Sequence, residues 1–536
     1  MPQEKNWLRL RLEKAFLTPI RAARKRYIPL LLVYFAYGLS GFSAIALSFW
    51  EKENLSLSAT QLISISVWIM VPWTLKMVFG QMVDSVPIFG SRRKSYIFLG
   101  ALLMAVGSLL LVGLAGRYPW AMWIGSEYTV YLLSAVFTTF GFVIQDTTAD
   151  TMTTEVVERH HIVRGKKVPR SEQDIQSDLA MVQVLGRLAL SIAGFAVAGL
   201  GGWLASRFSY EAVFWMTLGV PVISILGACF IKLEQMEGEG RTSVDMKILI
   251  GGIGFAVFSI VMAVVDAPFS QEIVFGVSLM LLILMLRLVT REVPSGKLKV
   301  LIFTMVALFI YRATALMGVG PGLNWWTIDA LKFDPAFFGV LAQIGAGVAL
   351  AVLWLFADFI ANRPVRSVLI FLVFFGTIMS LPELGLFYHL HELLGLSART
   401  VAFFDTAIGS PLVHISMVPL LALIAFYAPA KNRGTWFAVG ASFMNLAITG
   451  GELLTKYLNQ IFVVTRQVTD NMGNILVAQN YDELGVLMWW RLGIAFLVPL
   501  AAVYIFLKKT PHISTQEIKE DLSEEAPVPG RTSNYQ

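Results

Sequence analysis

The sequence has little charge, almost no cysteine and no motif that is typical of an enzyme. Charged residues make up 15% of its 536 positions and hydrophobic residues 56%. An average soluble domain carries about 25% charged residues, so this composition excludes an ordinary soluble protein. Cys229 is the only cysteine, which excludes a disulfide framework and a cysteine metal site. Because the chain also lacks a phosphate-binding loop and paired metal ligands at helical spacing, we expect no enzymatic activity, no cofactor and no metal.

What the sequence has instead is a series of long apolar segments. Each is about as long as a helix that crosses a bilayer, so we predict about fourteen membrane-spanning helices. They cover residues 27–49, 60–82, 95–116, 127–149, 179–203, 211–232, 247–265, 272–290, 298–320, 335–360, 366–385, 404–428, 433–457 and 486–507. The chain is therefore expected to be an all-α integral membrane protein whose solvent is the lipid bilayer.

Positive charge alternates from gap to gap between these segments. Most of the 42 Lys and Arg residues lie in the N-terminal tail, in the even-numbered gaps or in the C-terminal tail. The odd-numbered gaps hold Lys52, Arg117, Arg207, Lys332, Arg399 and Arg466, and Lys456 lies at the outer end of the helix 433–457. Because cytoplasmic loops carry the excess of positive charge, both termini are predicted to be cytoplasmic, in the cell (inner) membrane. The net charge of +6 then meets anionic lipid and indicates no nucleic-acid partner.

The predicted helices are grouped as six, two and six. The expected parts are a basic cytoplasmic tail (1–26), a six-helix bundle (27–233), a linker with an inserted hairpin of two helices (234–297), a second six-helix bundle (298–509) and a disordered cytoplasmic tail (510–536). Two halves with a substrate path between them are typical of secondary transporters. A weak internal repeat supports this organisation, because Asp84 and Asp358 end corresponding helices and basic loops follow both. We expect the protein to be a monomer.

The most specific motif covers residues 72–96, between the second and third predicted helices. Gly80 is expected to let two helices approach closely. Asp84 lies at the boundary of membrane and cytoplasm, and a tight loop after it is expected to bring Arg92 and Arg93 back towards acidic groups. Two interpretations stay open. The motif is either a loop that only sets the membrane orientation or a cytoplasmic latch whose ion pairs hold one of two conformations.

This motif resembles that of the folate–biopterin transporter family of the major facilitator superfamily. The matching residues are Lys76, Gly80, Asp84, Pro87, Ile88, Gly90, Arg92, Arg93 and Tyr96, whereas Met77 and Val83 stand where the family has proline and serine. Residues 146–155 and 434–452 are also similar to stretches of the family. The resemblance covers about 30–232 and 298–460, and it implies the major facilitator fold of two six-helix bundles, here with two extra central helices. Part of the pattern is shared with muropeptide permeases of the same superfamily.

Acidic residues gather at the inner end of the fourth predicted helix. Asp146 and Asp150 are four residues apart and share one helix face. Arg187 lies about 12 Å along the fifth helix, so we expect it to meet them. The cluster is either an ion-pair network that closes an inner gate or a site that also handles substrate and protons, because a carboxylate near arginine can exchange its partner for a proton. The candidates for proton coupling or gating are Asp150, Asp84, Arg92, Arg93 and Glu452.

Lys76, Arg187, Arg312 and Arg491 lie inside predicted helices, where a charge needs a partner. Arg491 follows two tryptophans at the outer end of the last helix and is expected to snorkel to the membrane surface. Arg312 is roughly 21 Å from the inner end of the ninth helix. It pairs either with an acid such as Glu452 or Asp405 or with a carboxylate of the substrate. Lys76 either snorkels to the cytoplasmic surface or faces the substrate path. The candidates for substrate binding are Arg312, Arg187, Asp146 and Lys76.

The resemblance implies a secondary active transporter that imports a folate- or pterin-like small organic solute, with protons as the second partner. A pterin edge offers paired N–H donors that suit a carboxylate, and a folate tail carries carboxylates that suit arginine. Two rival hypotheses stay open: a muropeptide permease-like transporter and a non-transporting membrane receptor or scaffold. Charges at mid-membrane depth argue against the second rival, because a scaffold has no use for groups that are so costly to bury.

Overall fold

The computed structural model covers the whole chain and describes most of it. The described residues are 23–91, 93–158, 160–163, 166–230, 246–265, 267–290, 295–361, 365–409, 433–469, 472 and 474–507. Several predictions lie outside them: those on the loop 231–245, on most of both tails, on most of the helix 404–428 and on Arg92.

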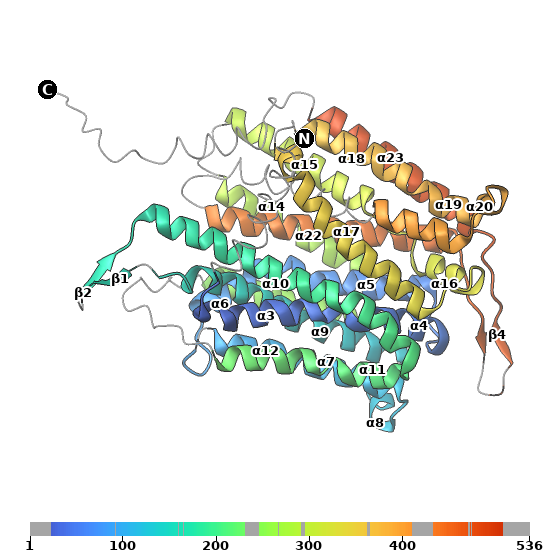
Figure 1. Ribbon diagram of the computed structural model, residues 1–536, viewed down its shortest axis with the longest axis horizontal. Helices are drawn as coiled ribbons and strands as arrows, with labels where there is room; N and C mark the ends of the chain where they lie inside the picture. The colour runs from blue at the N-terminus through green and yellow to red at the C-terminus, as the bar shows by residue number, and fades with distance from the viewer. Residues whose placement is uncertain are drawn as a thin grey trace, which may run out of the picture. The chain divides into compact units, whose positions relative to one another are not determined.

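Helices make up nearly all of the described chain (Figure 1). Up to the linker they are α3 (Ile28–Leu39), α4 (Ala44–Asn54), α5 (Ala59–Thr74), α6 (Lys76–Ser85), α7 (Lys94–Ala115), α8 (Pro119–Met122), α9 (Glu127–Glu155), α10 (Glu172–Arg207), α11 (Tyr210–Met216) and α12 (Gly219–Cys229), with 3-10 turns η2 (Lys25–Tyr27) and η3 (Ser40–Ser43). After it come α13 (Met246–Val265), α14 (Ser270–Val289), α15 (Ser295–Ala315), α16 (Pro321–Asp329), α17 (Pro335–Ala361), α18 (Val365–Met379), α19 (Leu381–Phe387), α20 (Leu390–Leu393), α22 (Arg433–Ile461) and α23 (Leu484–Phe506). Every predicted membrane helix overlaps an observed helix, although only the first residues of 404–428 are described.

Two short antiparallel hairpins accompany the helices. Strand β1 (His160–Val163) pairs with β2 (Lys166–Pro169), between α9 and α10. Strand β3 (Val468–Thr469) pairs with β4 (Ile475–Val477), between α22 and α23. Both hairpins lie in gaps of the predicted membrane topology, so they are compatible with an all-α membrane domain.

The surface of the helices fits lipid. In the described residues, nine helical stretches are long and apolar enough to cross a membrane, and three shorter apolar helices accompany them. Large apolar side chains on these helices are exposed, among them Leu102 of α7 at 60% and Val257 of α13 at 55%. Extended apolar surface is unusual on a soluble monomer but is what a bilayer requires.

Serine residues fix where several helices begin. Ser58, Ser126, Ser171 and Ser209 precede α5, α9, α10 and α11, and each hydroxyl accepts a hydrogen bond from the backbone N–H three residues later. Such caps satisfy N–H groups that the first helical turn leaves without partners. The cap at Ser171 explains why α10 begins well before the apolar segment predicted to start at 179.

Helices α7 and α9 pack so closely that only glycine fits at their contact. A Cβ atom on Gly100 would lie 2.7 Å from the carbonyl oxygen of Gly141. Beside this contact, Gln145 of α9 donates to the carbonyl of Ile97 on α7 and accepts from the hydroxyl of Ser224 on α12. Small residues and buried amide hydrogen bonds are typical of helix packing in membranes. They fix the rotation of α9 and therefore the direction of its acidic face.

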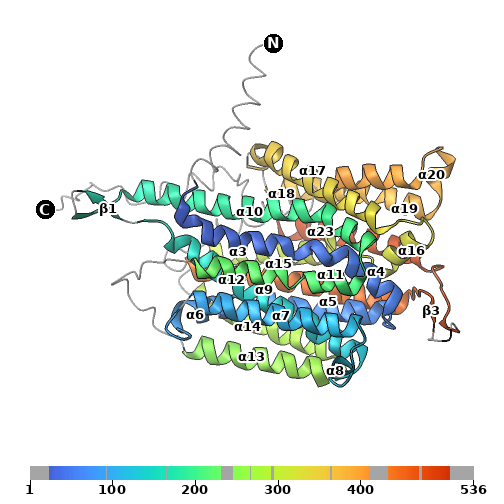
Figure 2. The same ribbon diagram turned by 60° about the horizontal axis from the view of Figure 1, so that its bottom comes forward.

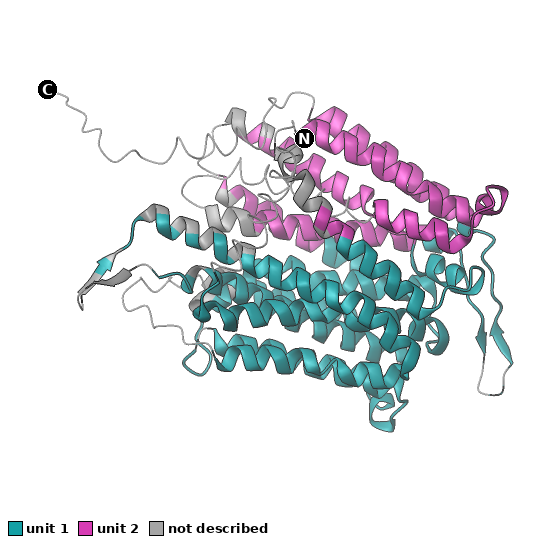
Figure 3. Cartoon of the chain, viewed as in Figure 1, with its two compact units in different colours: residues 1–275, 320–347, 459–484 teal, residues 276–319, 348–458, 485–536 magenta. Residues whose placement is uncertain are grey.

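The chain forms two compact units, which Figure 3 shows in teal and magenta. Unit 1 contains residues 1–275, 320–347 and 459–484, and unit 2 contains residues 276–319, 348–458 and 485–536. Unit 1 therefore combines the first predicted bundle with α16, the start of α17 and the β3–β4 hairpin. Contacts inside unit 1 join residues that are far apart in the sequence.

The first part of the inserted hairpin packs on the first bundle. Helix α13 and the first residues of α14, up to Phe275, belong to unit 1, whereas the rest of α14 belongs to unit 2. Helix α13 contacts α6, where a Cβ atom on Gly252 would lie 2.1 Å from Cγ1 of Val78, and Figure 2 shows α13 on the side of the bundle where α6 lies. At the start of α14, Gln271 Nε2 donates to the carbonyl of Ser64 in α5 at 3.0 Å. This part of the hairpin thus packs on α5 and α6, the helices that carry the specific motif.

Candidate functional site

A break in the second predicted helix places Lys76 inside the first bundle. Pro72 lies in the last turn of α5 and has no N–H for the helical ladder. Helix α5 ends at Thr74, Leu75 has φ −87° and ψ 0°, and α6 begins at Lys76. The segment predicted as one helix at 60–82 is therefore two helices. Lys76 begins the second of them, facing α9.

Lys76 bridges two carboxylates of α9. Its Nζ atom lies 2.6 Å from Oδ2 of Asp146 and 2.8 Å from Oδ2 of Asp150. Tyr34 of α3 donates a hydrogen bond to Oδ1 of Asp150 at 2.9 Å. We call Lys76, Asp146, Asp150 and Tyr34 the Lys76 cluster. The structure pairs Lys76 with α9 and does not show the snorkelling alternative, and the alternative that Lys76 faces the substrate path stays a prediction.

The two carboxylates of the Lys76 cluster differ in how much of each side chain is exposed. The side chain of Asp146 is 10% exposed and that of Asp150 is 35% exposed. Tyr34 also belongs to a buried apolar cluster with Leu30, Met152 and Val182. Because the cluster has two carboxylates and one ammonium, one negative charge is not balanced within it, and one further positive charge would balance it. Asp150 is the member that such a charge can reach more easily.

Arg187 lies near the Lys76 cluster without pairing with it. The residue is exposed on α10, and no salt bridge from Arg187 occurs in the described part of the chain. It is close enough to act electrostatically on Asp146 and on Tyr34. We expected Arg187 to meet the two carboxylates, but Lys76 takes that place because the break after Leu75 brings it next to α9. Arg187 is consequently a cation without a salt-bridge partner in the described structure.

The tight loop predicted after Asp84 is present. Phe89 has φ 46° and Gly90 has φ 76°, in the left-handed region. Ile88 and Ser91 exchange backbone hydrogen bonds of 3.0 and 3.1 Å across the turn. Tyr96 closes the loop from the other side, since its hydroxyl donates to the carbonyls of Met82 and Val86. The chain therefore reverses direction before α7, which carries Arg93 back towards α9.

Arg93 forms a buried ion pair with Glu155, the last residue of α9. The Nε atom lies 3.0 and 2.9 Å from the two carboxylate oxygens, Nη2 contacts the same carboxylate, and Nη1 donates to the carbonyl of Val83. Arg93 is 8% exposed. A buried bidentate pair does more than set membrane orientation, and the interpretation of the motif as a latch stays a prediction. Glu155 ends the stretch 146–155 that resembles the family, but its pairing with Arg93 was not predicted from the sequence.

The structure does not confirm the predictions for three other residues of the specific motif. Arg92 lies outside the described residues, and so does the side chain of Asp84, whose backbone belongs to the end of α6. The prediction that Gly80 permits a close helix approach is wrong. A Cβ atom there would lie 3.8 Å from Cγ2 of Thr147, which is an ordinary van der Waals contact.

A second group of contacts lies at the ends of α4 and α16, on the predicted outer side. Lys52 Nζ lies 2.6 Å from Oδ1 of Asp329. The hydroxyl of Tyr481 donates to Oδ2 of the same carboxylate at 2.6 Å. Burial and this hydrogen bond raise the pKa of the Tyr481 phenol, so it stays a donor at neutral pH. We call Lys52, Asp329 and Tyr481 the outer triad.

Arg466 secures the same side of unit 1. It is 3% exposed, and its Nη2 atom contacts the carbonyls of Leu55 and Leu57, at 3.3 Å for Leu57. Its guanidinium lies 5.1 Å from the ring centroid of Trp325. Burial lowers the pKa of Arg466, yet a guanidinium keeps its charge at neutral pH. Lys52 and Arg466 could have been singled out from the sequence, because they are among the few basic residues of the odd-numbered gaps.

Helices α10 and α17 touch backbone to backbone next to this group. A Cβ atom on Gly202 would lie 2.5 Å from the Cα of Gly339. Close by, a Cβ atom on Gly199 would lie 2.3 Å from Oε1 of Gln343. The first bundle and the outer segments of the second half are therefore packed without a gap at these positions.

The two candidates in the second half lie apart from any ion pair of the described residues. Arg312 of α15 is 7% exposed, and its Nε has no hydrogen-bond partner in the described part. Neither Glu452 nor Asp405 forms a salt bridge with it there, so the expected acid partner is not found. Glu452 of α22 is half-buried. Both residues belong to unit 2, whereas the Lys76 cluster belongs to unit 1.

A comparison with protein families identifies the family of the chain. Residues 37–515 match the BT1 family. The chain belongs to the BT1 family. The match covers most of both bundles and the hairpin between them, so it includes Lys76, Asp146 and Asp150 of the Lys76 cluster and the whole outer triad, whereas Tyr34 lies just before it.

Named relatives of this BT1 protein are transporters. A folate-biopterin transporter of Synechocystis sp. is 25% identical over 461 residues, 85% of this chain and 79% of the relative. Probable folate-biopterin transporter 4 of Arabidopsis thaliana is 21% identical over 471 residues, 82% of this chain and 89% of the relative. Folate transporter 2 of Plasmodium falciparum is 20% identical over 451 residues, 83% of each chain. The expected class, a membrane transporter without enzymatic activity, is confirmed.

Solved structures show the fold of this BT1 protein. Peptide transporter POT in complex with sulfate has a TM-score of 0.62 at 13% identity, and the likeness covers 91% of this chain and 95% of the other. A POT family transporter in complex with 5-aminolevulinic acid has a TM-score of 0.60 at 14% identity, with 90% and 96% covered. The predicted major facilitator fold is confirmed by this likeness, which concerns the fold alone.

Proposed function

We propose that the protein imports a folate- or pterin-like solute together with protons, as a monomer with both termini in the cytoplasm. The observation that supports this most is the Lys76 cluster, an ion-pair network inside the first bundle of a BT1 family transporter. Its relatives are named for folate and biopterin transport. Charges inside a membrane protein are costly and are kept where they handle a substrate or an ion.

The proton step involves Asp150. In the structure this carboxylate accepts from Lys76 at 2.8 Å and from Tyr34 at 2.9 Å. When Asp150 takes up a proton, it gives up its charged contact with Lys76, and the ammonium keeps Asp146 as its single counter-ion. One proton thus changes the ion pairing between α6 and α9. Asp84, Arg92 and Glu452 stay proposed as further gating or coupling groups.

The solute step involves the residues around this network. Asp146 can accept the paired N–H groups of a pterin edge once Lys76 moves aside. Arg187 is exposed and has no salt-bridge partner in the described residues, so it is free to receive an anionic group of the solute. Arg312, in unit 2, is proposed as a second contact for a solute carboxylate, because its planar fork suits bidentate binding.

The gates of this cycle lie at opposite ends of the first bundle. By the charge distribution, the outer triad lies outside and the Arg93–Glu155 pair lies inside. The outer triad is formed in the structure, so its contacts must break before solute enters from outside. The Arg93–Glu155 pair holds α7 to α9 at the inner end and is proposed to act as the latch of the inner gate.

Reconstitution into vesicles with an inward pH gradient tests the proposal. Labelled folate, a pterin and an anhydromuropeptide are offered separately to the wild-type protein and to Asp150→Asn. We expect folate or pterin to accumulate only with the gradient, and Asp150→Asn to abolish accumulation while it spares exchange. Accumulation of the muropeptide alone would replace the proposed substrate, and gradient-independent accumulation would refute proton coupling.

A further inference from the structure

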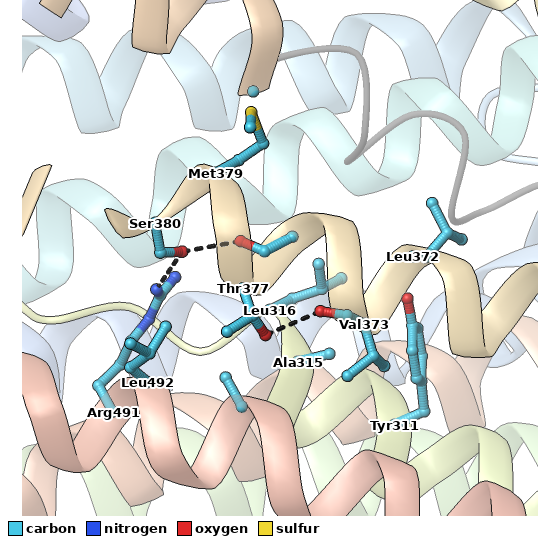
Figure 4. A pocket seen from close by; sticks show the side chains of 13 residues that line it. Tyr311, Ala315, Leu316, Leu372, Val373, Thr377, Met379, Ser380, Arg491 and Leu492 are labelled. Atoms are coloured by element: carbon cyan, nitrogen blue, oxygen red, sulfur yellow. Dashed lines mark hydrogen bonds between the residues drawn. The ribbon is translucent and has the colours of Figure 1, made fainter. Parts of the chain in front are cut away.

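Unit 2 contains a cavity of about 230 Å³ that the function described so far does not use. It lies among α15, α18 and α23 (Figure 4). Its polar side is formed by Tyr311, Thr377, Ser380 and Arg491, and apolar residues such as Leu372 and Leu492 form the rest. A cavity with an apolar wall and a few convergent polar groups is the usual form of a small-molecule site.

Arg491 lies where two helices of unit 2 are interrupted. Its Nε atom donates to the carbonyl of Met317, just beyond the end of α15, at 3.0 Å. Its Nη1 atom donates to Oγ of Ser380, between α18 and α19, at 2.9 Å. These two bonds hold the guanidinium in one orientation at the cavity wall, and Figure 4 shows the one to Ser380. Interrupted membrane helices often form binding sites, because they present polar groups at membrane depth.

The cavity has donors that are not used. The Nη2 atom of Arg491 has no acceptor among the described residues, and it is not sealed off from the cavity. The hydroxyl of Tyr311 likewise has no hydrogen-bond partner in the described chain, although the residue is 2% exposed. A fixed guanidinium with a spare N–H edge and a nearby phenol match the acceptor oxygens of a carboxylate.

The acids of unit 2 leave this guanidinium available. Glu383 of α19 is close enough to act electrostatically on Arg491 and on Asp405, but no described carboxylate forms a salt bridge with Arg491. The segment 410–432, which follows the cavity residue Gly409, contains neither Asp nor Glu. The arginine therefore carries a charge that its described surroundings do not pair directly.

We propose that the cavity is a subsite for a carboxylate of the transported solute, bound by Arg491 and Tyr311. That the bound acid is the transported solute rests on the proposed function, whereas carboxylate binding does not. Sites that hold a whole drug-sized molecule measure about 300–1,000 Å³, so a cavity of about 230 Å³ holds one end of a solute. The chemical class is an organic acid whose apolar or aromatic part lies against Leu372 and Leu492.

A purely structural role for Arg491 is the alternative. The bonds to Met317 and Ser380 place a cation near the carboxyl end of α15, which stabilises a helix without any ligand. In that case the residue matters equally for every ligand and for heat stability. A carboxylate subsite instead predicts discrimination between an acid and its uncharged ester.

The test measures equilibrium binding to the purified full-length protein by calorimetry. The probes are N-benzoylglutamate and its dimethyl ester, in which a methyl group on each carboxylate removes the negative charge. We expect the wild-type protein to prefer the acid, Arg491→Gln to weaken acid binding about 10- to 100-fold without changing ester binding, and Arg491→Lys to restore part of it. Equal affinity of the wild-type protein for acid and ester, or equal loss of both in Arg491→Gln, would overturn the proposal.

Two further variants keep the test decisive. Tyr311→Phe removes one hydroxyl that bonds to no described residue, so it should fold normally and weaken acid binding about 2- to 10-fold; unchanged acid binding in Tyr311→Phe would count against the subsite. Glu383→Gln should leave acid binding equal or tighter, whereas a loss like that of Arg491→Gln would mean that Arg491 only pairs with Glu383. If the vesicles accumulate neither folate nor pterin while acid binding still depends on Arg491, the substrate assignment fails and the subsite stands.

Discussion

Lys52 Nζ and Asp329 Oδ1 lie 2.6 Å apart although 277 positions separate the residues in sequence. The contact joins the end of α4 to the end of α16, and Tyr481 adds a second bond to the same carboxylate. Both partners are more than three-quarters buried, with side-chain exposures of 12% and 21%. Removing one partner of an ion pair with so little solvent contact costs more than breaking a surface pair, because it leaves a charge unpaired in a place that water hardly reaches.

Loss of this pair is expected to open the predicted outer side. Ser48 of α4 accepts from Asn324 of α16 at 3.3 Å, so Ser48→Cys is a reporter in a Cys229→Ser background. In Lys52→Ala, we expect a membrane-impermeant maleimide to label this cysteine about fivefold faster or more, the change that about 1 kcal/mol produces. The measurement is the labelling rate in intact cells.

Lys332→Gln is the matched control for this variant. Lys332 is exposed, lies in the same predicted outer gap as Asp329 and forms no hydrogen bond or ion pair with a described residue. The substitution changes the same charge without touching the outer triad. Equal acceleration in both variants would show that general charge, and not the pair, sets the rate.

The Lys76 cluster predicts a variant that fails in two ways. Lys76→Met leaves Asp146 and Asp150 facing one another without their shared cation, and breaking a buried pair costs about 3–5 kcal/mol. We expect uptake to be lost and the unfolding temperature in detergent to fall. Lys76→Met/Asp150→Asn restores the original net charge of the cluster by leaving Asp146 as its single charge, and it should recover most of the stability but not the gradient-driven uptake. A double variant as unstable as the single one would contradict this account of the cluster.

The Arg93–Glu155 pair is expected to matter for stability as well as gating. Arg93→Ala leaves the half-buried Glu155 carboxylate and the Val83 carbonyl without their donor, at a cost of about 3–5 kcal/mol. Arg93→Lys keeps the charge but not the bidentate contact and should lose less. Thermal unfolding of both variants checks the order. If Arg93→Ala unfolds at the wild-type temperature, the pair is only a surface contact.

A pair of glycines gives a test of the helix packing. Gly100→Ala places a methyl group 2.7 Å from the carbonyl of Gly141, and such overpacking costs about 1–3 kcal/mol. Gly80→Ala places one in ordinary contact at 3.8 Å from Thr147 and should be neutral. Detergent-solubilised yield and unfolding temperature compare the two. A larger loss for Gly80→Ala would show that its helix changes neighbours during transport.

Much of the architecture could be predicted from the sequence because hydropathy and charge are local signals. The positions of the membrane helices follow from apolar length, and the tight loop before α7 follows from its turn residues. The interruption after the ninth helix was visible in Gly318, Gly320 and Pro321: α15 ends at Ala315, Gly320 has φ 101°, and α16 begins at Pro321. Backbone rules of this kind need no knowledge of the tertiary structure.

The partners of the charged residues could not be predicted in the same way. The sequence placed Asp146 and Asp150 on one face but left the partner open, because the choice between Lys76 and Arg187 depends on a break in α5 and α6. Arg491 follows two tryptophans and was expected to snorkel at a membrane surface. It bonds instead to a helix end and a serine of other helices, which only the packing of distant segments determines.

The contact between Gly202 and Gly339 determines how the outer side responds to its surroundings. Two backbones meet there without a side chain between them, so the attraction is dispersion, and ionic strength does not screen it. The Lys52–Asp329 pair is largely buried and is therefore screened much less than a surface pair. We expect both contacts to stay formed in brine as well as in fresh water.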